Sequence, residues 1–480
     1  MNALLTLRIL GALLLFLAAA LLTPIPFSIY FADGAAGAFL AAALISFVAG
    51  LTLYKKCQSK RELSVREGFA IVTFGWGFYA LFGALPFLFS GAIPSPVDAI
   101  FETMSGFTTT GSTILANIES LPESILFWRA LTHWMGGMGI IVLSLAILPM
   151  LGVGGMQLFK AEVPGPTADR LKPRIQDTAK LLWGVYVLLT IAEVVLLMLG
   201  GMNLYEALCH AFATLATGGF STRNASVGAY GSAYIDWVVT VFMFLAGVNF
   251  SLHYQVLRGR PREFWRNEEF RFYFFITAVT TVLIVLLNQG TIYGSFFDNL
   301  RYSAFQVVSI LTTTGFATAD YETWPVLAQY LLVFLMFVGG CAGSTGGGMK
   351  VARMLLLFKH AQVQLYRLIH PRAVRLVKLG GVPVDREVMQ SILGFFAFYM
   401  GIFVVASFLM AASGLDLTSA GAAVIATLSN VGPGLGTLGP VDNFAHVSAF
   451  GKIVLTLCML MGRLELFTVL VLFFPSFWRK

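Results

Sequence analysis

Residues 108–111 read TTTG, and three related tetrapeptides follow along the chain, namely ATGG at 216–219, TTTG at 312–315 and SNVG at 429–432. Their last glycines recur at comparable intervals, as expected for duplicated units with loops of different length. Thirteen residues before the first, second and fourth of these glycines stands a polar residue that can start a helix, while in the third copy such residues come slightly earlier. These helix starters are Asp98, Glu206 and Ser419, with Asp298 and Asn299 in the third copy. The repeat predicts four short helices, each followed by a loop that contains glycine.

Each short helix lies between two long apolar segments, and the resulting units span roughly 67–160, 178–262, 268–362 and 386–475. The apolar segments have the ~20 residues that an α-helix needs to cross a bilayer. Two full crossings and one re-entrant helix return the chain to the side where the unit began, so all four units have the same orientation. Four parallel copies around one axis predict a pore, whereas inverted repeats would predict a rocking carrier.

Two further apolar segments precede the repeats, at about Leu4–Leu22 and Ala35–Tyr54, and the second ends at Lys55 and Lys56. No small-residue cleavage site follows the first segment, so we expect a retained helix. We therefore predict an all-α integral membrane protein with four parallel helix–pore loop–helix units around one pore, preceded by an N-terminal two-helix hairpin. The predicted boundaries are 1–60 for the hairpin and 61–160, 161–262, 263–380 and 381–480 for pore units 1 to 4, the third with a broken second helix.

Composition excludes a soluble protein, and the placement of charge argues against nucleic acid binding. Of the 480 residues, 58% are hydrophobic and 11% are charged, and the mean hydropathy is +0.81. The formal net charge is +7, but the basic residues gather in 55–66, 160–180, 258–271 and 350–386, while the opposite ends of the apolar segments carry acidic residues. This is the positive-inside pattern of a multi-pass membrane protein, so we expect no nucleic acid partner. The basic clusters are suited to contact anionic membrane lipids.

Threonine and glycine in the four tetrapeptides supply what a filter for K⁺ needs. A ring of backbone carbonyls replaces the water around K⁺ without adding fixed charge. Glycine reaches the positive φ that turns successive carbonyls toward one axis, and Thr or Ser adds hydroxyl oxygens. The short helices also direct their negative C-terminal ends at the pore centre, which favours a cation. The predicted potassium-binding residues are Thr109, Thr110, Gly111, Thr217, Gly218, Gly219, Thr313, Thr314, Gly315, Asn430, Val431 and Gly432.

Glycine and threonine also let membrane helices pack closely, which is their commoner role in lipid. For a single loop we would prefer that explanation. Four copies in matching positions of four matching units favour the pore, because non-helical backbone at membrane depth is tolerated only where protein or a water-filled cavity surrounds it.

Beyond the repeats, the stretches 161–183, AEVPGPTADRLKPRIQDTAKLLW, and 462–470, GRLELFTVL, resemble the TrkH and KtrB family of potassium transporters, as do the two added N-terminal helices and the single filter glycine per unit. The resemblance covers nearly the whole chain and is strongest to the TrkH branch. It implies a bacterial inner-membrane homodimer with one pore per subunit, coupled to a cytoplasmic, TrkA-like ring of nucleotide-binding regulatory subunits. The filter differs from the TVGYG of ordinary K⁺ channels, so weaker discrimination against Na⁺ is expected.

Residues 338–349, VGGCAGSTGGGM, interrupt the second helix of unit 3, since each glycine costs about 1 kcal/mol relative to Ala in a helix. Lipid cannot satisfy the freed backbone groups, so the segment is expected to line a water-filled cavity. Arg463 lies in the middle of the final apolar helix, where a charge costs roughly 2.5–3.5 kcal/mol on insertion scales. The alternatives are a close-packing surface for the glycines and an ion pair between Arg463 and Glu193, and the resemblance favours a gate. The predicted gate consists of Gly343, Ser344, Thr345, Gly346, Gly347 and Arg463.

Two alternatives to the K⁺ pore stay open: a Na⁺-coupled or weakly selective monovalent cation carrier, and a membrane enzyme that acts on lipid substrates. The sequence has no nucleotide-binding glycine loop between a strand and a helix, no nucleophile motif and no paired carboxylates in a catalytic context. We therefore expect transport rather than catalysis, with K⁺ as the transported ion and no organic cofactor.

Overall fold

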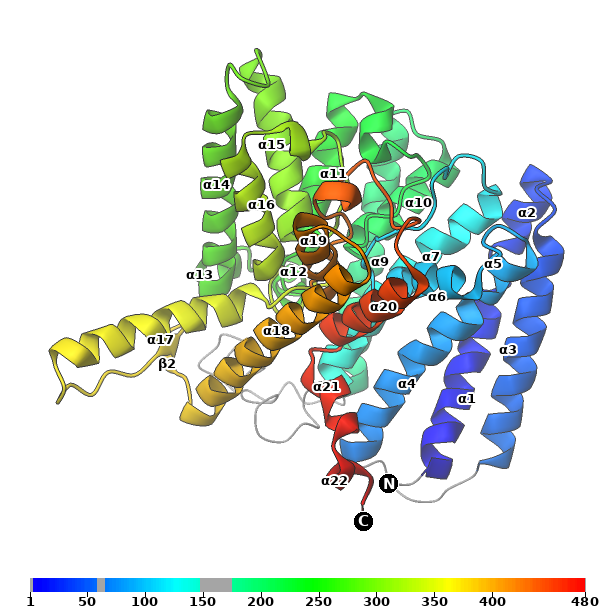
Figure 1. Cartoon of the computed structure of the whole chain (residues 1–480), viewed down its shortest axis with the longest axis horizontal. Helices are drawn as coiled ribbons and strands as arrows, with labels where there is room; N and C mark the ends of the chain where they lie inside the picture. The colour runs from blue at the N-terminus through cyan, green and yellow to red at the C-terminus, as the bar shows by residue number, and fades with distance from the viewer. Residues whose placement is uncertain (1–2, 58–64, 147–174, 480) are drawn as a thin grey trace.

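The computed structural model describes residues 3–57, 65–146 and 175–479, which form almost entirely α-helices (Figure 1). By length and composition, this part of the chain has 6 helices that can cross a membrane, or up to 8 if each of two bent helix pairs is one span. Residues 147–174 lie outside the described residues. They include the predicted end of pore unit 1, most of the 160–180 basic cluster and much of the 161–183 stretch.

The N-terminal hairpin consists of α1 (Ala3–Ala20), α2 (Ile25–Phe31) and α3 (Ala36–Lys56). Helices α1 and α3 approach closely because two glycines face each other. A Cβ added to Gly11 would lie 2.8 Å from the carbonyl oxygen of Gly50, and one added to Gly50 would lie 2.9 Å from that of Gly11. The hairpin lies at one edge of the molecule beside α4 (Val65–Gly83), and both chain termini lie at the lower end in Figure 1.

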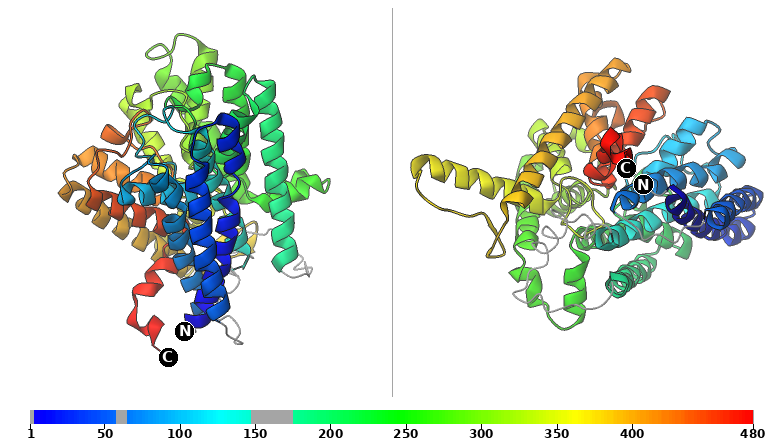
Figure 2. Two further views of the ribbon diagram at one scale, coloured as in Figure 1. Left: turned by 90° about the vertical axis from the view of Figure 1, so that its right-hand side faces the viewer. Right: turned by 90° about the horizontal axis from the view of Figure 1, so that it is seen from below.

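Each of the four units begins with a long helix and continues into a shorter one that points toward the centre. The long helices are α4, α9 (Ile175–Leu199), α14 (Glu268–Asn288) and α18 (Arg386–Ala412), and a short α5 (Leu85–Phe89) follows α4. The shorter ones, which we name the pore helices, are α6 (Pro96–Phe107), α10 (Leu204–Leu215), α15 (Phe296–Leu311) and α19 (Leu417–Leu428). Viewed from below in Figure 2, the four units follow one another around a common centre.

Within the described residues, the second helix is broken in units 2, 3 and 4. In unit 1, α7 (Glu123–Ala146) is continuous over its described length. In unit 2, the chain bends by 103° between α11 (Ala233–Ala246) and α12 (Phe250–Leu257). In unit 3, residues 339–350 separate α16 (Val326–Val338) from α17 (Val351–Ile369). In unit 4, the chain bends by 113° between α20 (Ala449–Arg463) and the segment 467–473. The structure confirms the interruption predicted in unit 3. The prediction that Arg463 lies in the middle of the final helix was wrong, because Arg463 is the last residue of α20.

One projecting helix and several short elements complete the described chain. Helix α17 projects from the body in Figures 1 and 2, and β1 (Lys378–Leu379) and β2 (Val382–Pro383) form a small antiparallel hairpin between α17 and α18. This hairpin is the one departure from the all-α prediction in the described part, and its turn uses the positive φ of Gly380 and Gly381. The remaining elements are α13 (Arg262–Arg266), α21 (Phe467–Leu470), α22 (Pro475–Trp478), and the 3-10 turns η2 (Ser226–Tyr230), η3 (Tyr321–Thr323), η4 (Gly436–Leu438) and η5 (Val471–Phe473).

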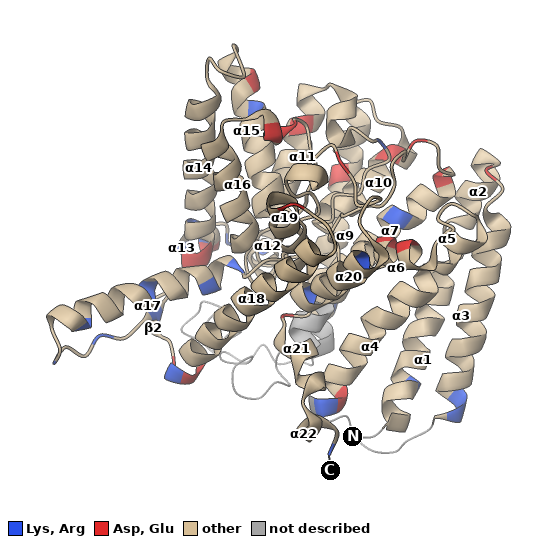
Figure 3. Cartoon of the chain, in the orientation of Figure 1, with Lys and Arg blue, Asp and Glu red and all other residues tan. Residues whose placement is uncertain are grey.

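Charged residues are divided unequally between the two ends of the molecule (Figure 3). Most Lys and Arg lie toward the lower end, with both termini and α17, while acidic residues gather toward the upper end. Asp98, Glu206 and Asp298 lie in the first turns of α6, α10 and α15. By the positive-inside rule, the lower end faces the cytoplasm.

Candidate ion pathway

The pore helices begin with side-chain caps that lie three residues before the predicted helix starters. A side-chain oxygen of each cap accepts hydrogen bonds from backbone N–H groups in the first turn, at 2.8 to 3.5 Å. The caps are Ser95, Asn203, Ser295 and Asp416. The predicted starters lie inside the first turn, where acidic side chains suit the positive end of the helix dipole. In unit 3 they come earlier in the sequence because α15 has 16 residues, whereas the other pore helices have 12.

All four pore helices end in the same hydrogen-bonding pattern. In unit 1, the N–H of Thr110 donates to the carbonyl of Ser105 at 2.8 Å, and the N–H of Thr109 donates to Gly106 at 3.0 Å. The equivalent pairs in units 2, 3 and 4 have distances of 2.7–2.8 Å and 2.9–3.1 Å. This is the Schellman motif, which puts the first residue after the C-cap in the left-handed region. The four loops therefore leave their helices with one shared geometry.

The left-handed position holds threonine three times, although glycine or asparagine is usual there. The residues at this position in units 1 to 4 are Thr109, Thr217, Thr313 and Asn430, and their φ angles are 51°, 54°, 61° and 56°. A β-branched residue in this region carries backbone strain of about 1–3 kcal/mol. Two residues later φ is positive again, at 85°, 79°, 79° and 102° in Gly111, Gly219, Gly315 and Gly432. Reversing the sign of φ at every second residue turns successive carbonyls toward the same side of the chain, as a carbonyl-lined filter needs.

The four filter glycines, Gly111, Gly219, Gly315 and Gly432, close a ring with the residues that precede them. Each glycine is so close to a carbonyl of the next unit that a Cβ has no room, and the contacts run from unit 1 to 2, 2 to 3, 3 to 4 and 4 back to 1. The contacts, with the distance from the added Cβ to the carbonyl oxygen, are Gly111 to Gly218 (2.1 Å), Gly219 to Thr314 (2.0 Å), Gly315 to Val431 (2.1 Å) and Gly432 to Thr110 (2.7 Å). The structure thus brings all twelve predicted filter residues into one ring of four loops.

Hydrogen bonds between threonine hydroxyls, and one from an asparagine side-chain amide, hold the filter loops in place. The hydroxyls of Thr108 and Thr110 lie 2.7 Å apart, and those of Thr312 and Thr314 lie 2.8 Å apart. In unit 4, Asn430 Nδ2 donates to Thr110 Oγ1 at 2.9 Å, which ties unit 4 to unit 1. The sequence prediction did not include Thr108 or Thr312, although each is the first Thr of its TTTG tetrapeptide. On the outer side, a cavity of about 170 Å³ is lined by all four filter glycines.

On the other side of the ring lies the segment 339–350, which we name the intramembrane loop. The N–H of Gly347 donates to Thr313 Oγ1 at 2.6 Å, and the N–H of Gly348 donates to the carbonyl of Ser429 at 2.9 Å. Thr345 Oγ1 donates to the carbonyl of Leu215, the last residue of α10, at 2.9 Å. The loop is therefore bonded to the inner ends of pore units 2, 3 and 4.

Arg463 reaches the same loop. Its side chain is only 3% exposed, and its guanidinium donates to the carbonyl of Thr345 at 2.6 Å and to that of Gly136 in α7 at 3.3 Å. Among the described residues no ion pair joins Arg463 to Glu193, so the alternative of a structural ion pair was wrong. The structure brings Arg463 together with the glycine-rich loop, as the sequence predicted.

Contacts that the sequence did not predict hold both ends of the intramembrane loop. Glu269, buried in the first turn of α14, accepts from the N–H groups of Ala342 at 2.7 Å and Ala352 at 3.2 Å. At the break of unit 2, the carbonyl of Gly247 accepts from Cys341 N–H at 2.8 Å. Below the loop, Arg353 in α17 pairs with Glu465 at 2.5 Å. Three broken helices thus meet at one level, directly inside the ring.

Parallel units around a ring of glycine-containing loops define a pore-forming class of multi-pass membrane protein. A family model described as "TrkH: Cation transport protein" matches residues 36–480, and the chain belongs to this family. The family consists of transporters, so the chain is not an enzyme, as the sequence predicted, and it is a multi-pass protein of the bacterial inner membrane.

Named relatives match over nearly their whole length. The "Trk system potassium uptake protein TrkH" of Salmonella typhimurium is 45% identical over 478 residues, which are 98% of this chain and 99% of that protein. The protein of the same name from Escherichia coli K12 is 44% identical over 478 residues, with the same shares covered. The crystal structure of the potassium transporter TrkH from Vibrio parahaemolyticus superposes with a TM-score of 0.92 at 41% identity and covers 100% of both chains.

Proposed function

We propose that the chain takes up K⁺ across the bacterial inner membrane through a channel-like filter made of the four pore loops. The observation that carries this proposal is the ring in which each filter glycine lies against a carbonyl of the next unit. The relatives named as potassium uptake proteins support the same ion.

The filter replaces the water around K⁺ with carbonyl oxygens. Four pore helices end at the ring, so their partial negative charge stabilises a cation at the centre. Carbonyls on such loops suit the loosely held water of K⁺ and Rb⁺ better than the tightly held water of Na⁺. The candidate ligands are the carbonyl groups of Thr109, Thr110, Gly111, Thr217, Gly218, Gly219, Thr313, Thr314, Gly315, Asn430, Val431 and Gly432.

The gate is the intramembrane loop together with Arg463. Bonds from the loop to Thr313 and Ser429 support a closed path directly inside the filter. The charge of Arg463 beside the loop repels a cation that leaves the ring, so closure combines steric blockage with electrostatic repulsion. The glycines at 343, 346, 347 and 348 let the loop rearrange, because glycine tolerates many backbone angles, and Gly343 and Gly348 already have positive φ.

Helix α17 connects this gate to the cytoplasmic end. It begins at Val351, immediately after the loop, and Arg353 in its first turn pairs with Glu465 beyond the break of α20. A pull on α17 therefore acts on the loop and on the segment next to Arg463 together. We assign this pull to a cytoplasmic ring of nucleotide-binding regulatory subunits, which the basic residues in 350–386 support as a docking surface.

The assembly we propose is a homodimer with one pore in each subunit. Its support is the projection of α17 from the body (Figure 2), together with the apolar side chains that the helix exposes. The most exposed of these side chains are Phe358, Leu365, Leu368 and Ile369. Native mass spectrometry of the chain in detergent tests the assembly: a dimer is expected, and monomers alone at micromolar concentration contradict it.

Ion flux in liposomes that hold only this protein tests the proposed function. We expect a K⁺ gradient to drive flux in the absence of Na⁺ and without an added lipid substrate. Flux that requires Na⁺ would instead indicate the Na⁺-coupled carrier, and the absence of K⁺ flux in folded protein would contradict the pore.

A further inference from the structure

In three of the four units, the pore-helix residue nine positions before the filter glycine bonds the chain that follows the filter. This position holds Glu102, His210, Gln306 and Ala423 in units 1 to 4. In unit 2, His210 Nε2 is hydrogen-bonded to Ser221 Oγ at 3.0 Å, and in unit 3, Gln306 Nε2 donates to the carbonyl of Ala319 at 3.3 Å. Alanine cannot make such a bond in unit 4. Only unit 1 has a carboxylate at this position, that of Glu102.

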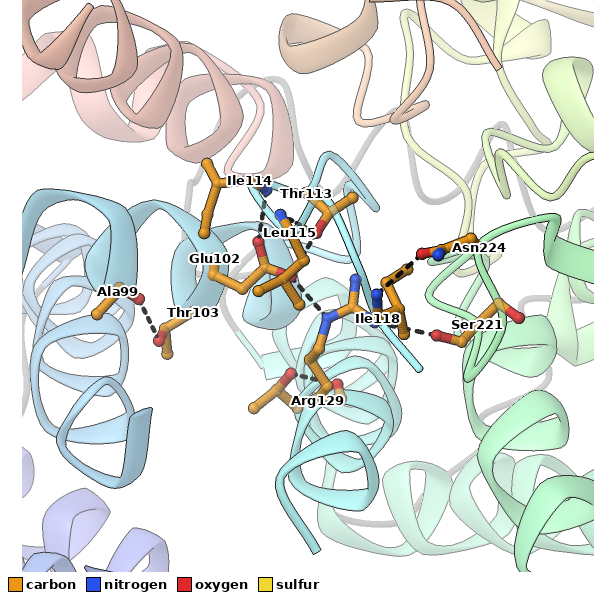
Figure 4. A network of polar contacts seen from close by, with 11 residues as sticks. Ala99, Glu102, Thr103, Thr113, Ile114, Leu115, Ile118, Arg129, Ser221 and Asn224 are labelled. Atoms are coloured by element: carbon orange, nitrogen blue, oxygen red, sulfur yellow. Dashed lines mark hydrogen bonds and ion pairs between the residues drawn. The ribbon is translucent and has the colours of Figure 1, made fainter. Parts of the chain in front are cut away.

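Glu102 holds the outer end of the first filter loop. Its carboxylate accepts from Thr113 Oγ1 at 2.9 Å and from the N–H of Ile114 at 3.0 Å (Figure 4). The same carboxylate pairs with Arg129 Nε of α7 at 2.6 Å. The exposed fractions of the two side chains are 0% for Glu102 and 2% for Arg129. A buried ion pair of this kind is costly unless further hydrogen bonds satisfy both partners, and here they do.

Arg129 carries the connection into unit 2. Its Nη1 donates to the carbonyl of Ser221 at 3.0 Å, and its guanidinium lies 3.7 Å from the ring centre of Phe220. Phe220 and Ser221 directly follow the filter glycine of unit 2. The pair formed by Glu102 and Arg129 therefore joins the outer ends of two adjacent filter loops, and we name it the strut.

The strut also places a positive charge at the mouth of a cation path. Arg129 lines the outer cavity that contains all four filter glycines. An unpaired guanidinium there would repel incoming cations. This repulsion would be strong because protein surrounds the cavity and screens charge less than water does. The carboxylate of Glu102 cancels that charge at 2.6 Å.

We propose that Glu102 and Arg129 are positioning residues that determine ion selectivity: they hold the first two filter loops in register, and Glu102 keeps the mouth of the pore electrically neutral. This inference rests on the proposed K⁺ filter. Neither residue is proposed to bind the ion. Their effect on selectivity is exerted through the segments 113–114 and 220–221 that they hold, and the effect of Glu102 on flux is exerted through the charge of Arg129.

Charge-neutralising variants separate the two roles. Glu102→Gln keeps the shape but leaves Arg129 uncompensated and replaces one of the two accepting oxygens with a donor, so K⁺ flux into liposomes should fall by about tenfold and selectivity should fall with it. Arg129→Gln frees the carbonyl of Ser221, so the preference for K⁺ over Na⁺ should fall by at least about threefold. The double variant removes both charges, so its flux should recover above that of Glu102→Gln while its selectivity stays low.

Further variants keep the test valid if one protein fails to fold. Arg129→Lys keeps the positive charge but lacks the planar fork that reaches Glu102 and Ser221 together, so flux should persist while selectivity falls. Arg266→Gln removes the exposed pair with Glu263 at 3.1 Å and serves as the matched control. Unchanged selectivity in both Arg129 variants, or a double variant no more active than Glu102→Gln, would overturn the proposal. Gly315→Ser distinguishes this from failure of the filter itself, because its selectivity must fall even if the strut has no role.

Discussion

Thr313 occupies a strained backbone position and at the same time bonds the gate. Its φ of 61° lies in the left-handed region, and its hydroxyl accepts the N–H of Gly347 at 2.6 Å. Glycine at this position would relieve the strain, which is about 1–3 kcal/mol, but would lose the hydroxyl. At this position the hydroxyl of Thr313 therefore offers the gate a bond that glycine could not make.

Thr313→Val tests that bond. Valine has nearly the same shape but no acceptor, and it leaves the Gly347 N–H unsatisfied at a cost of about 1–3 kcal/mol in the closed state. Basal K⁺ flux in liposomes should rise by about tenfold, because that cost falls on the closed state alone. Thr313→Ser keeps the hydroxyl and is the matched control. Equal flux from the Val and Ser variants would show that this bond does not hold the gate.

Gly315→Ala tests the ring. The new Cβ would lie 2.1 Å from the carbonyl oxygen of Val431, and the residue would keep a φ of 79° that alanine disfavours. The carbonyl of Val431 must turn away, so the ratio of K⁺ to Na⁺ flux should fall by about tenfold or more. Gly184→Ala is the control, since nothing lies within 4 Å of its added Cβ in α9. Normal selectivity in folded Gly315→Ala protein would mean that these loops do not form the filter.

At this scale the sequence predicted which residues form the four loops, but it predicted the backbone conformation of the glycines better than that of the threonines before them. Gly111, Gly219, Gly315 and Gly432 were identifiable because positive φ leaves few alternatives to glycine. The left-handed conformation of Thr109, Thr217 and Thr313 was not predicted, because local sterics oppose that conformation in a β-branched residue. The helix starters were placed three residues late because the cap and the first turn both favour polar residues.

At the scale of elements, three broken helices meet inside the filter. The twelve-residue glycine-rich segment of unit 3 is readable from composition alone. The break in unit 2 has a weaker signal, with Gly247 as the C-cap of α11 and Asn249 as the N-cap of α12, and the sequence analysis did not use it. The break after Arg463 is hidden, since Glu465 and Leu466 adopt positive φ (58° and 44°) without any glycine.

Opening the intramembrane loop should raise flux without changing ion preference. Deletion of residues 343–347 removes the bonds from Thr345 and Gly347, and Arg463→Ala removes both the positive charge and the bond to Thr345. Each variant should raise basal K⁺ flux by about tenfold while the ratio of K⁺ to Na⁺ flux stays near normal, because the filter ring is untouched. Liposome flux with each cation measures both quantities. Unchanged or lower flux for both folded variants would return Arg463 to a purely structural role.

At the scale of the whole molecule, charge placement predicts orientation. Asp298 lies in the first turn of α15 toward the upper end, and Arg262, whose side chain is exposed, begins α13 at the opposite end of α14. In a background without the four native cysteines, Asp298→Cys should react with a membrane-impermeant thiol reagent from outside the cell, and Arg262→Cys should react only after lysis. Labelling of the Arg262 position in intact cells would reverse the assigned topology.

The central claim is that the four loops together bind the transported ion. The most direct measurement is a crystal structure of this chain grown with Rb⁺ or Tl⁺, whose anomalous scattering locates the ion independently of the protein model. We expect a peak on the axis of the ring, coordinated by carbonyls of Thr109, Thr217, Thr313 and Asn430 or of the residues that follow them. Anomalous peaks elsewhere in the membrane region, with the ring unoccupied at saturating ion concentration, would contradict it.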